Sequence, residues 1–324
     1  MDWQKNSLRM GAVVILLAVL LRLWGNGTVQ ALGAVLKDPA VGSFLMYLET
    51  GRIVRPVPVE QMEEPEIPAT EAPALPAFSA EESDRVYVRG TGPETVDIPA
   101  LLETVLDMDL TGDAPAVLIL HTHTTESYTM EDETYEQTAA YRTLDPEYNM
   151  LSIGERLGQL LEEAGISVVC AQAVHDYPQY NGAYDRSRET IQAMLEQYPS
   201  IQLVLDLHRD AATYADGSQY ATSVTVNGEK IAQLMLVMGT DASGMAHPHW
   251  QENLSVALKV LAQLEMQAPG ITRTTTLRTS RYNQDLHSAM LLVEVGSAGN
   301  TLQQALAAVE ILADALIALK DGAN

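Results

Sequence analysis

Short apolar runs alternate with segments of helical spacing along residues 116–319, and this alternation constrains the fold more than any other feature. The runs have the length of buried strands and cover residues 116–120, 166–170, 201–207, 234–238 and 290–295. The other segments carry apolar residues three or four apart, at 149–164, 185–198, 252–266 and 301–319. The pattern predicts an α/β fold, with a mostly parallel, twisted sheet flanked by helices. Binding sites in such sheets form where strands end.

Weaker signals predict short strands at residues 86–88, 95–98 and 221–226, the last followed by an Asn227-Gly228 turn. The chain has a single cysteine, Cys170, so an intramolecular disulfide and a multi-cysteine zinc site are both excluded. Cys170 ends an apolar run, and we expect it to be a buried strand residue.

The N-terminal region predicts a membrane anchor. An unbroken apolar run at 11–21 follows Lys5 and Arg9, and Trp24 suits a membrane interface. Basic residues before the run favour a single-pass orientation with the rest of the chain outside the cytoplasm. A cleaved signal peptide is the alternative, because the stretch at 29–31, Val-Gln-Ala, resembles a cleavage site.

A linker rich in Pro, Glu and Ala follows, densest at residues 54–76. This composition cannot bury a core, so we expect an extended tether. The predicted organisation is an anchor at 1–28, a juxtamembrane segment and linker at 29–84, and a catalytic domain at 85–324.

The net charge narrows the range of partners. At −24, with 43 acidic against 19 basic residues, the surface repels phosphate backbones, so we expect no nucleic-acid partner.

Potential metal ligands follow two of the predicted strands. His121, His123 and Glu126 come directly after the run at 116–120. His208 leaves the run at 201–207, between Asp206 and Asp210, which are near enough to orient its ring. Imidazole nitrogens and a carboxylate suit zinc. Beside His208, Arg209 is a candidate for holding a carboxylate or carbonyl of a substrate.

Glu294 is a lone acid inside the last apolar run. A buried carboxylate without a partner is unfavourable, so we expect either a structural arginine or a zinc-bound water beside it. Facing such a water, Glu294 would act as general base and then as proton donor to a leaving amine.

Several separated motifs, in order, resemble the stage II sporulation protein P family. They are His-Thr-His-Thr-Thr-Glu-Ser-Tyr at 121–128, Asp-Leu-His-Arg-Asp-Ala at 206–211 and Leu-Leu-Val-Glu-Val-Gly at 291–296, with further matches at 175–178, 180–184, 187–188 and 249–254. The resemblance implies a peptidoglycan hydrolase of spore-forming bacteria that acts in forespore engulfment as an N-acetylmuramoyl-L-alanine amidase and endopeptidase. It also implies a fold similar to that of zinc-dependent cell-wall amidases, and the stage II sporulation proteins D and M as partners.

Carried over by motif, His123 and His208 match two zinc ligands, and Glu294 matches the catalytic glutamate. The acidic ligand departs from the amidase pattern, where it comes at a helix start. We assign Glu126 by its spacing, with Glu147 as the competitor. His121 and His175 remain candidates for ligands or transition-state stabilisers. The expectation is one Zn²⁺ per chain.

Two other functions fit some of these residues. A zinc carboxypeptidase also combines a His-x-x-Glu pair with a distant histidine and a late glutamate. A glycan-binding scaffold without turnover is the alternative that is not an enzyme. The complete His, His, Glu set argues against it, because a protein without activity would be free to lose these residues.

Overall fold

The computed structural model describes residues 88–90, 96–131, 135–214 and 218–320. The predicted anchor at 1–28 and linker at 29–84 lie outside these residues, so the proposed domain organisation stays a prediction.

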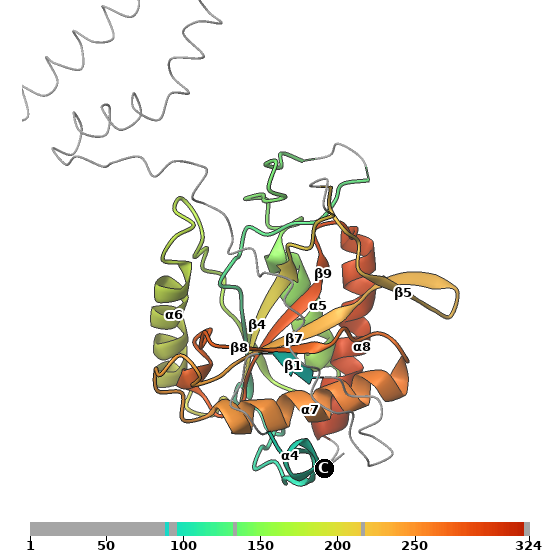
Figure 1. The fold of residues 1–324 in the computed structure, drawn as a ribbon. Coiled ribbons are helices and arrows are strands. Elements are labelled where there is room, and N and C mark those ends of the chain that lie inside the picture. The colour runs from blue at the N-terminus through green and yellow to red at the C-terminus, as the bar shows by residue number, and fades with distance from the viewer. Residues whose placement is uncertain (1–87, 91–95, 132–134, 215–217, 321–324) are drawn as a thin grey trace, which may run out of the picture. The chain divides into compact units, whose positions relative to one another are not determined.

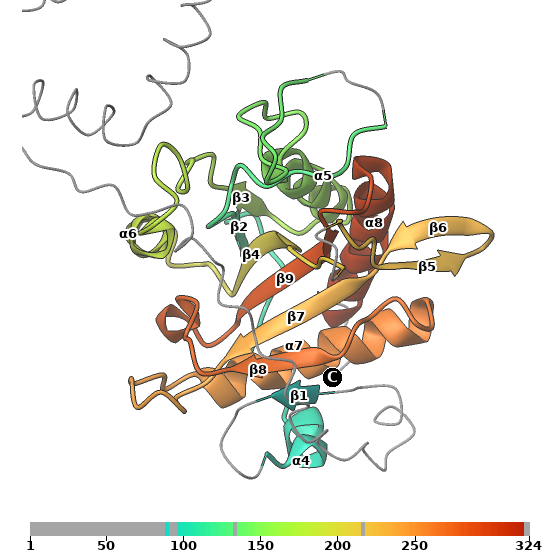
Figure 2. The ribbon, with the colours of Figure 1, turned by 45° about the horizontal axis from the view of Figure 1, so that its top comes forward.

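A seven-stranded sheet lies at the centre of the described residues, and Figures 1 and 2 show it from two directions. Its strands are ordered β1-β8-β7-β9-β4-β2-β3. All neighbours pair in parallel except β7 and β9, which are antiparallel. The predicted fold class is therefore confirmed. The strands are β1 (Val88–Gly90), β2 (Val117–Leu120), β3 (Val168–Cys170), β4 (Leu203–Asp210), β7 (Leu234–Gly239), β8 (Thr275–Arg278) and β9 (Met290–Ser297).

Helices cover both faces of the sheet. Helices α5 (Met150–Glu163), α7 (Trp250–Gln267) and α8 (Leu302–Lys320) share the larger apolar core with one face. Helix α6 (Ala183–Gln197) lies on the opposite side in Figure 1, where Ile191 packs in a smaller core with residues of β2 and β4. The core thus fixes β4 and β9 from both sides.

Local signals explain where the elements begin and end. Asn149 caps α5 by accepting a hydrogen bond from the backbone N–H of Leu151 at 2.9 Å, and Gly165 follows the helix in the left-handed region. The predicted Asn227-Gly228 turn joins β5 (Ser223–Val226) to β6 (Glu229–Ala232), with positive φ at both turn residues.

Two expectations need correction, and one strand was not predicted. Instead of the strand predicted at 95–98, Ile98 begins helix α4 (Ile98–Glu103), because Asp97 caps it by accepting from the N–H of Ala100. Strand β8 was not predicted, because its Thr-rich sequence has no apolar run. Cys170 is in a strand as expected, but it is only half-buried, since β3 lies at the edge of the sheet.

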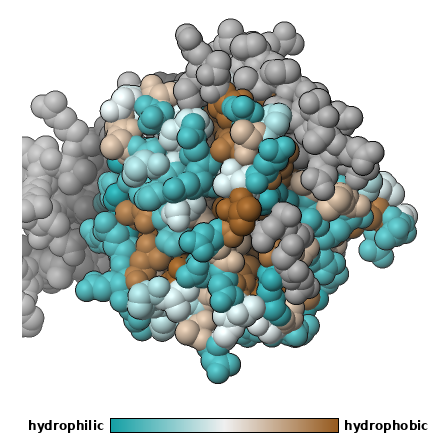
Figure 3. Space-filling model, turned by 90° about the horizontal axis from the view of Figure 1, so that it is seen from below, coloured by the Kyte–Doolittle hydropathy of each residue, from teal (hydrophilic) through white to brown (hydrophobic). Residues whose placement is uncertain are grey.

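Among the described helices, α8 has the length and composition to cross a membrane. It packs instead with residues such as Leu312 and Leu316 in the core, against α5 and α7. We therefore interpret α8 as a core helix. Figure 3, seen from the side of α4 and α7, shows mostly hydrophilic residues with apolar patches between them.

Candidate active site

His123, Glu126 and His208 converge on one point. Each offers a ligand atom, and these atoms all lie within 4.8 Å of one another. Glu126 places one carboxylate oxygen 3.5 Å from Nδ1 of His123 and the other 3.5 Å from Nδ1 of His208. Tetrahedral zinc with bonds of about 2.0–2.1 Å would separate its ligand atoms by roughly 3.3–3.4 Å, so the donor set fits this ion.

The sheet order brings these residues together. Strands β2 and β4 are parallel neighbours, so the turn that follows β2 lies beside the end of β4. That turn carries His123 and Glu126, and the N–H of Glu126 donates to the carbonyl of His123 at 3.1 Å. His208 lies in β4 itself.

Asp206 contacts the far side of the His208 ring, as the sequence predicted. Its carboxylate lies 3.0 Å from Nε2 of His208 and also accepts from the N–H and hydroxyl of Thr122. Burial opposes a charge on His208, but the carboxylates of Asp206 and Glu126 outweigh burial and raise its pKa well above the ordinary value. Such a carboxylate fixes the orientation of a ligating imidazole. The other expected neighbour, Asp210, pairs instead with Arg273 at 2.6 Å.

Glu126 is a buried carboxylate that stays ionised. Burial alone would raise its pKa, but the Arg209 guanidinium and the two histidines outweigh burial and lower the pKa well below the usual range. Arg142 adds an ion pair at 3.3 Å. An ionised oxygen donor is the form that a cation requires.

Arg209 lies behind Glu126. The Arg209 guanidinium donates to the backbone carbonyls of Ser127, Ala140 and Tyr141. The backbone N–H of Arg209 donates to the Glu126 carboxylate at 3.2 Å. This geometry favours a positioning role over the substrate contact expected from the sequence, because the side chain is buried and its donors are largely occupied.

Glu294 lies on β9 directly opposite His208 on β4. Its Oε2 is buried and has no hydrogen-bond partner in the structure, and no described arginine forms an ion pair with Glu294. Burial, reinforced by the charge of Asp210, raises the pKa of Glu294 to about 8. An orphaned carboxyl beside a set of metal ligands is placed to exchange protons with a reacting water.

Two candidate histidines are buried outside the cluster. Nδ1 of His121 lies 3.1 Å from the carbonyl of Leu207, and burial lowers the pKa of His121 to about 4. Both ring nitrogens of His175 have partners, the carbonyl of His121 and the hydroxyl of Thr190. These contacts indicate structural roles for both histidines.

Glu147, the competitor for the acidic ligand, is exposed and is not among the clustered residues. Of the described acids, Glu126 is the one that the fold places against both histidines. The assignment of Glu126 as a zinc ligand stays a prediction, as do those of His123 and His208.

Sequence reasoning assigned no role to the aromatic side chains of the site. Tyr180 stacks on His123 at 4.7 Å, and Tyr184 meets the same ring edge-on at 5.5 Å. Arg142 lies over Tyr180 and pairs with Asp176 at 2.6 Å. The available signal was the match of residues 180–184 to the motif of the resembled family, since Tyr180 precedes α6 and Tyr184 lies in its first turn.

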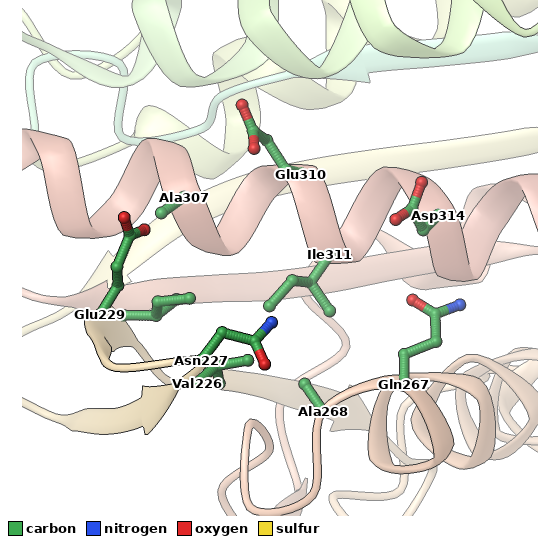
Figure 4. Close-up of a pocket in the computed structure, with 10 residues that line it drawn as sticks. Val226, Asn227, Glu229, Gln267, Ala268, Ala307, Glu310, Ile311 and Asp314 are labelled. Atoms are coloured by element: carbon green, nitrogen blue, oxygen red, sulfur yellow. The ribbon is translucent and has the colours of Figure 1, made fainter.

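A separate hollow of about 640 Å³ lies between the β5–β6 hairpin and the helices α7 and α8, as Figure 4 shows. Its rim carries Glu229, Glu310 and Asp314, and Ile311 points into it. None of the clustered histidines or glutamates lines this hollow, so the candidate chemistry lies elsewhere.

Comparison with known proteins gives a family. The sequence model described as Stage II sporulation protein P matches residues 57–317. The stage II sporulation protein P of Bacillus subtilis (strain 168) is 29% identical over 217 residues, which are 63% of this chain and 51% of that protein. The chain thus spans about half the length of this relative.

Solved structures with partial similarity include amidases. The N-acetylmuramoyl-L-alanine amidase AmiC2 of Nostoc punctiforme has a TM-score of 0.38 and 14% identity, covering 64% of this chain and 97% of that one. Ami1 of Mycobacterium smegmatis has a TM-score of 0.38 and 11% identity, covering 66% and 99%. The CwlD amidase of Clostridioides difficile, solved with the GerS lipoprotein, has a TM-score of 0.37 and 12% identity, covering 64% and 97%.

Proposed function

The chain belongs to the stage II sporulation protein P family, and from this premise we propose that it is a zinc-dependent peptidoglycan hydrolase. Its bond is the N-acetylmuramoyl-L-alanine amide, with stem-peptide cross-links as a second target, and it acts in forespore engulfment. The observation that carries the proposal is the convergence of His123, Glu126 and His208 beside the orphaned carboxyl of Glu294.

Each residue has a defined task in this proposal. His123, Glu126 and His208 would hold one zinc ion, which when bound supplies Lewis acidity toward water and a carbonyl oxygen. Glu294 takes a proton from the attacking water and gives it to the leaving amine. Asp206 holds the orientation of the His208 ring, and Arg209 keeps Glu126 ionised and in place.

The cellular setting belongs to the same proposal. The N-terminal segment anchors the protein as a single-pass membrane protein, and the catalytic domain works outside the cytoplasm on peptidoglycan. The stage II sporulation proteins D and M are its proposed partners.

Dye release from purified sacculi tests the chemistry. Glu294→Gln should lower the rate by roughly 10²–10⁴-fold because it removes the proton-transferring group. Zinc content should stay near that of the wild type. The exposed Glu147→Gln variant is the matched control and should release dye normally. Equal release by wild type and Glu294→Gln would remove Glu294 from the mechanism.

Metal analysis tests the ligand set independently of turnover. His123→Ala should bind zinc at well below one ion per chain, whereas the exposed His249→Ala should bind as the wild type does. Identifying the new ends formed from muropeptides then separates an amidase from an endopeptidase or a zinc carboxypeptidase. Unchanged zinc in His123→Ala would refute the assigned site.

A further inference from the structure

Arg278 at the end of β8 is a cation without a hydrogen-bonding or ion-pair partner among the residues that the structure describes. Its Nε–H is buried and donates to no acceptor among the described residues, and its guanidinium forms no ion pair among them. Other arginines differ, since Arg142, Arg188 and Arg273 each pair with an aspartate. A buried donor without an acceptor is unfavourable, so an anionic ligand at this point would supply the hydrogen-bond acceptor that Arg278 lacks.

Strand pairing puts Arg278 on the same face of the sheet as Glu294. Glu294 of β9 lies opposite Met235 of β7, and Val237, two residues along β7, lies opposite Thr276 of β8. Residues two apart in a strand share a face, so Arg278 shares a face with Thr276. A strip of sheet therefore runs from the candidate catalytic acid to this guanidinium. The strip is buried and packs against Tyr282, so a bound peptide would pass over Tyr282.

The length of this strip fits a short peptide. Two strand spacings of about 4.8 Å and four residues of about 3.3 Å place the Cα atoms of Glu294 and Arg278 about 16 Å apart. An extended peptide covers about 3.3–3.6 Å per residue, so about five residues bridge the two positions, and fewer suffice once the reach of the Arg278 side chain is counted.

The loop that follows β8 supports a binding role for this end of the strip. Tyr282 packs against Met235 and Val237, and both Tyr282 and Asn283 have positive φ. The Asn283 side chain donates to the carbonyl of Tyr184, so the loop is tied to the start of α6 at the histidine cluster. Strained non-glycine residues held by neighbouring contacts are concentrated at ligand sites.

We propose that Arg278 binds a carboxylate of the substrate's peptide, several residues from the amide that is cleaved. The proposal rests on the proposed function, because the peptide must reach Glu294. A guanidinium binds a carboxylate through two parallel hydrogen bonds, and its planar shape selects for that group. The contact would set substrate affinity and would play no part in the chemical step.

A matched pair of soluble muropeptides tests the proposal, one with free peptide carboxylates and one with the same carboxylates amidated. Arg278→Gln should raise KM for the free form on the order of 10- to 100-fold and leave kcat unchanged, because the loss is a charged hydrogen bond. KM for the amidated form should not change. Lys230→Gln, which removes an exposed cation from β6, is the control and should behave as the wild type.

Stability provides a second readout. Arg278 has no partner to lose, so Arg278→Leu should unfold at the temperature of the wild type or above it. A lower unfolding temperature, or equal KM changes for both muropeptides, would overturn the carboxylate assignment. Calorimetric binding of the free stem peptide to the Glu294→Gln protein separates the two proposals, since it requires no turnover. If wild type cleaves neither muropeptide but Arg278→Gln still weakens peptide binding, the proposed function fails and the binding site stands.

Discussion

Two glutamates of the site have opposite charge states because their surroundings differ. Glu126 contacts Arg142 and lies near Arg209, so its pKa is well below the usual range. Glu294 is instead buried near the negative charge of Asp210, and both effects raise its pKa, to about 8. Separating the pKa values of two carboxyl groups is a common way to assign one to binding and the other to proton transfer.

The raised pKa of Glu294 predicts a pH-dependent stability for the zinc-free protein. Between the unfolded value of 4.5 and the folded value of about 8, the folded chain holds one more proton than the unfolded chain. The free energy of unfolding should therefore fall as pH rises from about 5 to 9, by a few kcal/mol relative to Glu294→Gln. Denaturant titrations of both proteins in chelator, at several pH values, measure the difference. Parallel pH profiles would contradict the assigned protonation.

At the scale of elements, α5 packs closely against the turn that follows β2, because two of its residues are glycines. A Cβ added to Gly154 would lie 2.5 Å from Nε2 of His121, which is closer than real contacts allow. Gly158, one turn along, faces Cys170 at 3.1 Å. The two glycines let the helix approach the strands that carry the site.

This close approach predicts an unusual effect of alanine in a helix. Gly154→Ala should lower the free energy of unfolding by about 1–3 kcal/mol, although alanine normally favours a helix over glycine by about 1 kcal/mol. Gly158→Ala is the comparison and should lose less, because only a thiol must move. Thermal unfolding measures both, and a more stable Gly154→Ala would show that the contact with His121 is unimportant.

Sequence patterns predicted the elements that have a strong local signal. Strands β2, β4 and β9 are continuous apolar runs because they are covered on both faces, and α5 has both a cap and a stop. Strand β8 has no such run, because its buried residues include two threonines. These are buried because the neighbouring elements cover them, not because their side chains are apolar. Such a strand is recognised only when the sheet around it is known.

The same distinction applies to the site. The sequence predicted that His123, Glu126 and His208 would meet, because strand ends of a parallel sheet lie together. It could not predict that Arg209 turns toward backbone carbonyls or that Tyr184 meets the His123 ring edge-on. Those directions depend on side-chain packing between segments far apart in the sequence.

At the scale of the whole molecule, the net negative charge of the protein repels the proposed, negatively charged substrate. The chain carries a net charge of −24, and peptidoglycan peptides carry carboxylates. Long-range repulsion should slow the encounter at low salt, where the Debye length is about 30 Å, and less so at 0.15 M, where it is about 8 Å.

We therefore expect kcat/KM on intact sacculi to rise several-fold as salt increases from 10 to 150 mM. A small, fully amidated muropeptide should show a much weaker effect, since it has little charge to repel. Turnover measured across a potassium chloride series checks this, and a rate on sacculi that falls steadily with salt would mean that local attraction dominates.

Strand β9 lies between β7 and β4, at the middle of the sheet, although it comes last in chain order among the described strands. Until β9 has been made, no hydrogen bonds between strands link β2, β3 and β4 to β7 and β8, and Glu294 is not yet part of the chain. A chain made only as far as residue 289 holds the candidate ligands without the candidate acid, and without the strand that joins the two parts of the sheet. Completion of the sheet and completion of the proposed site therefore coincide in the order of synthesis.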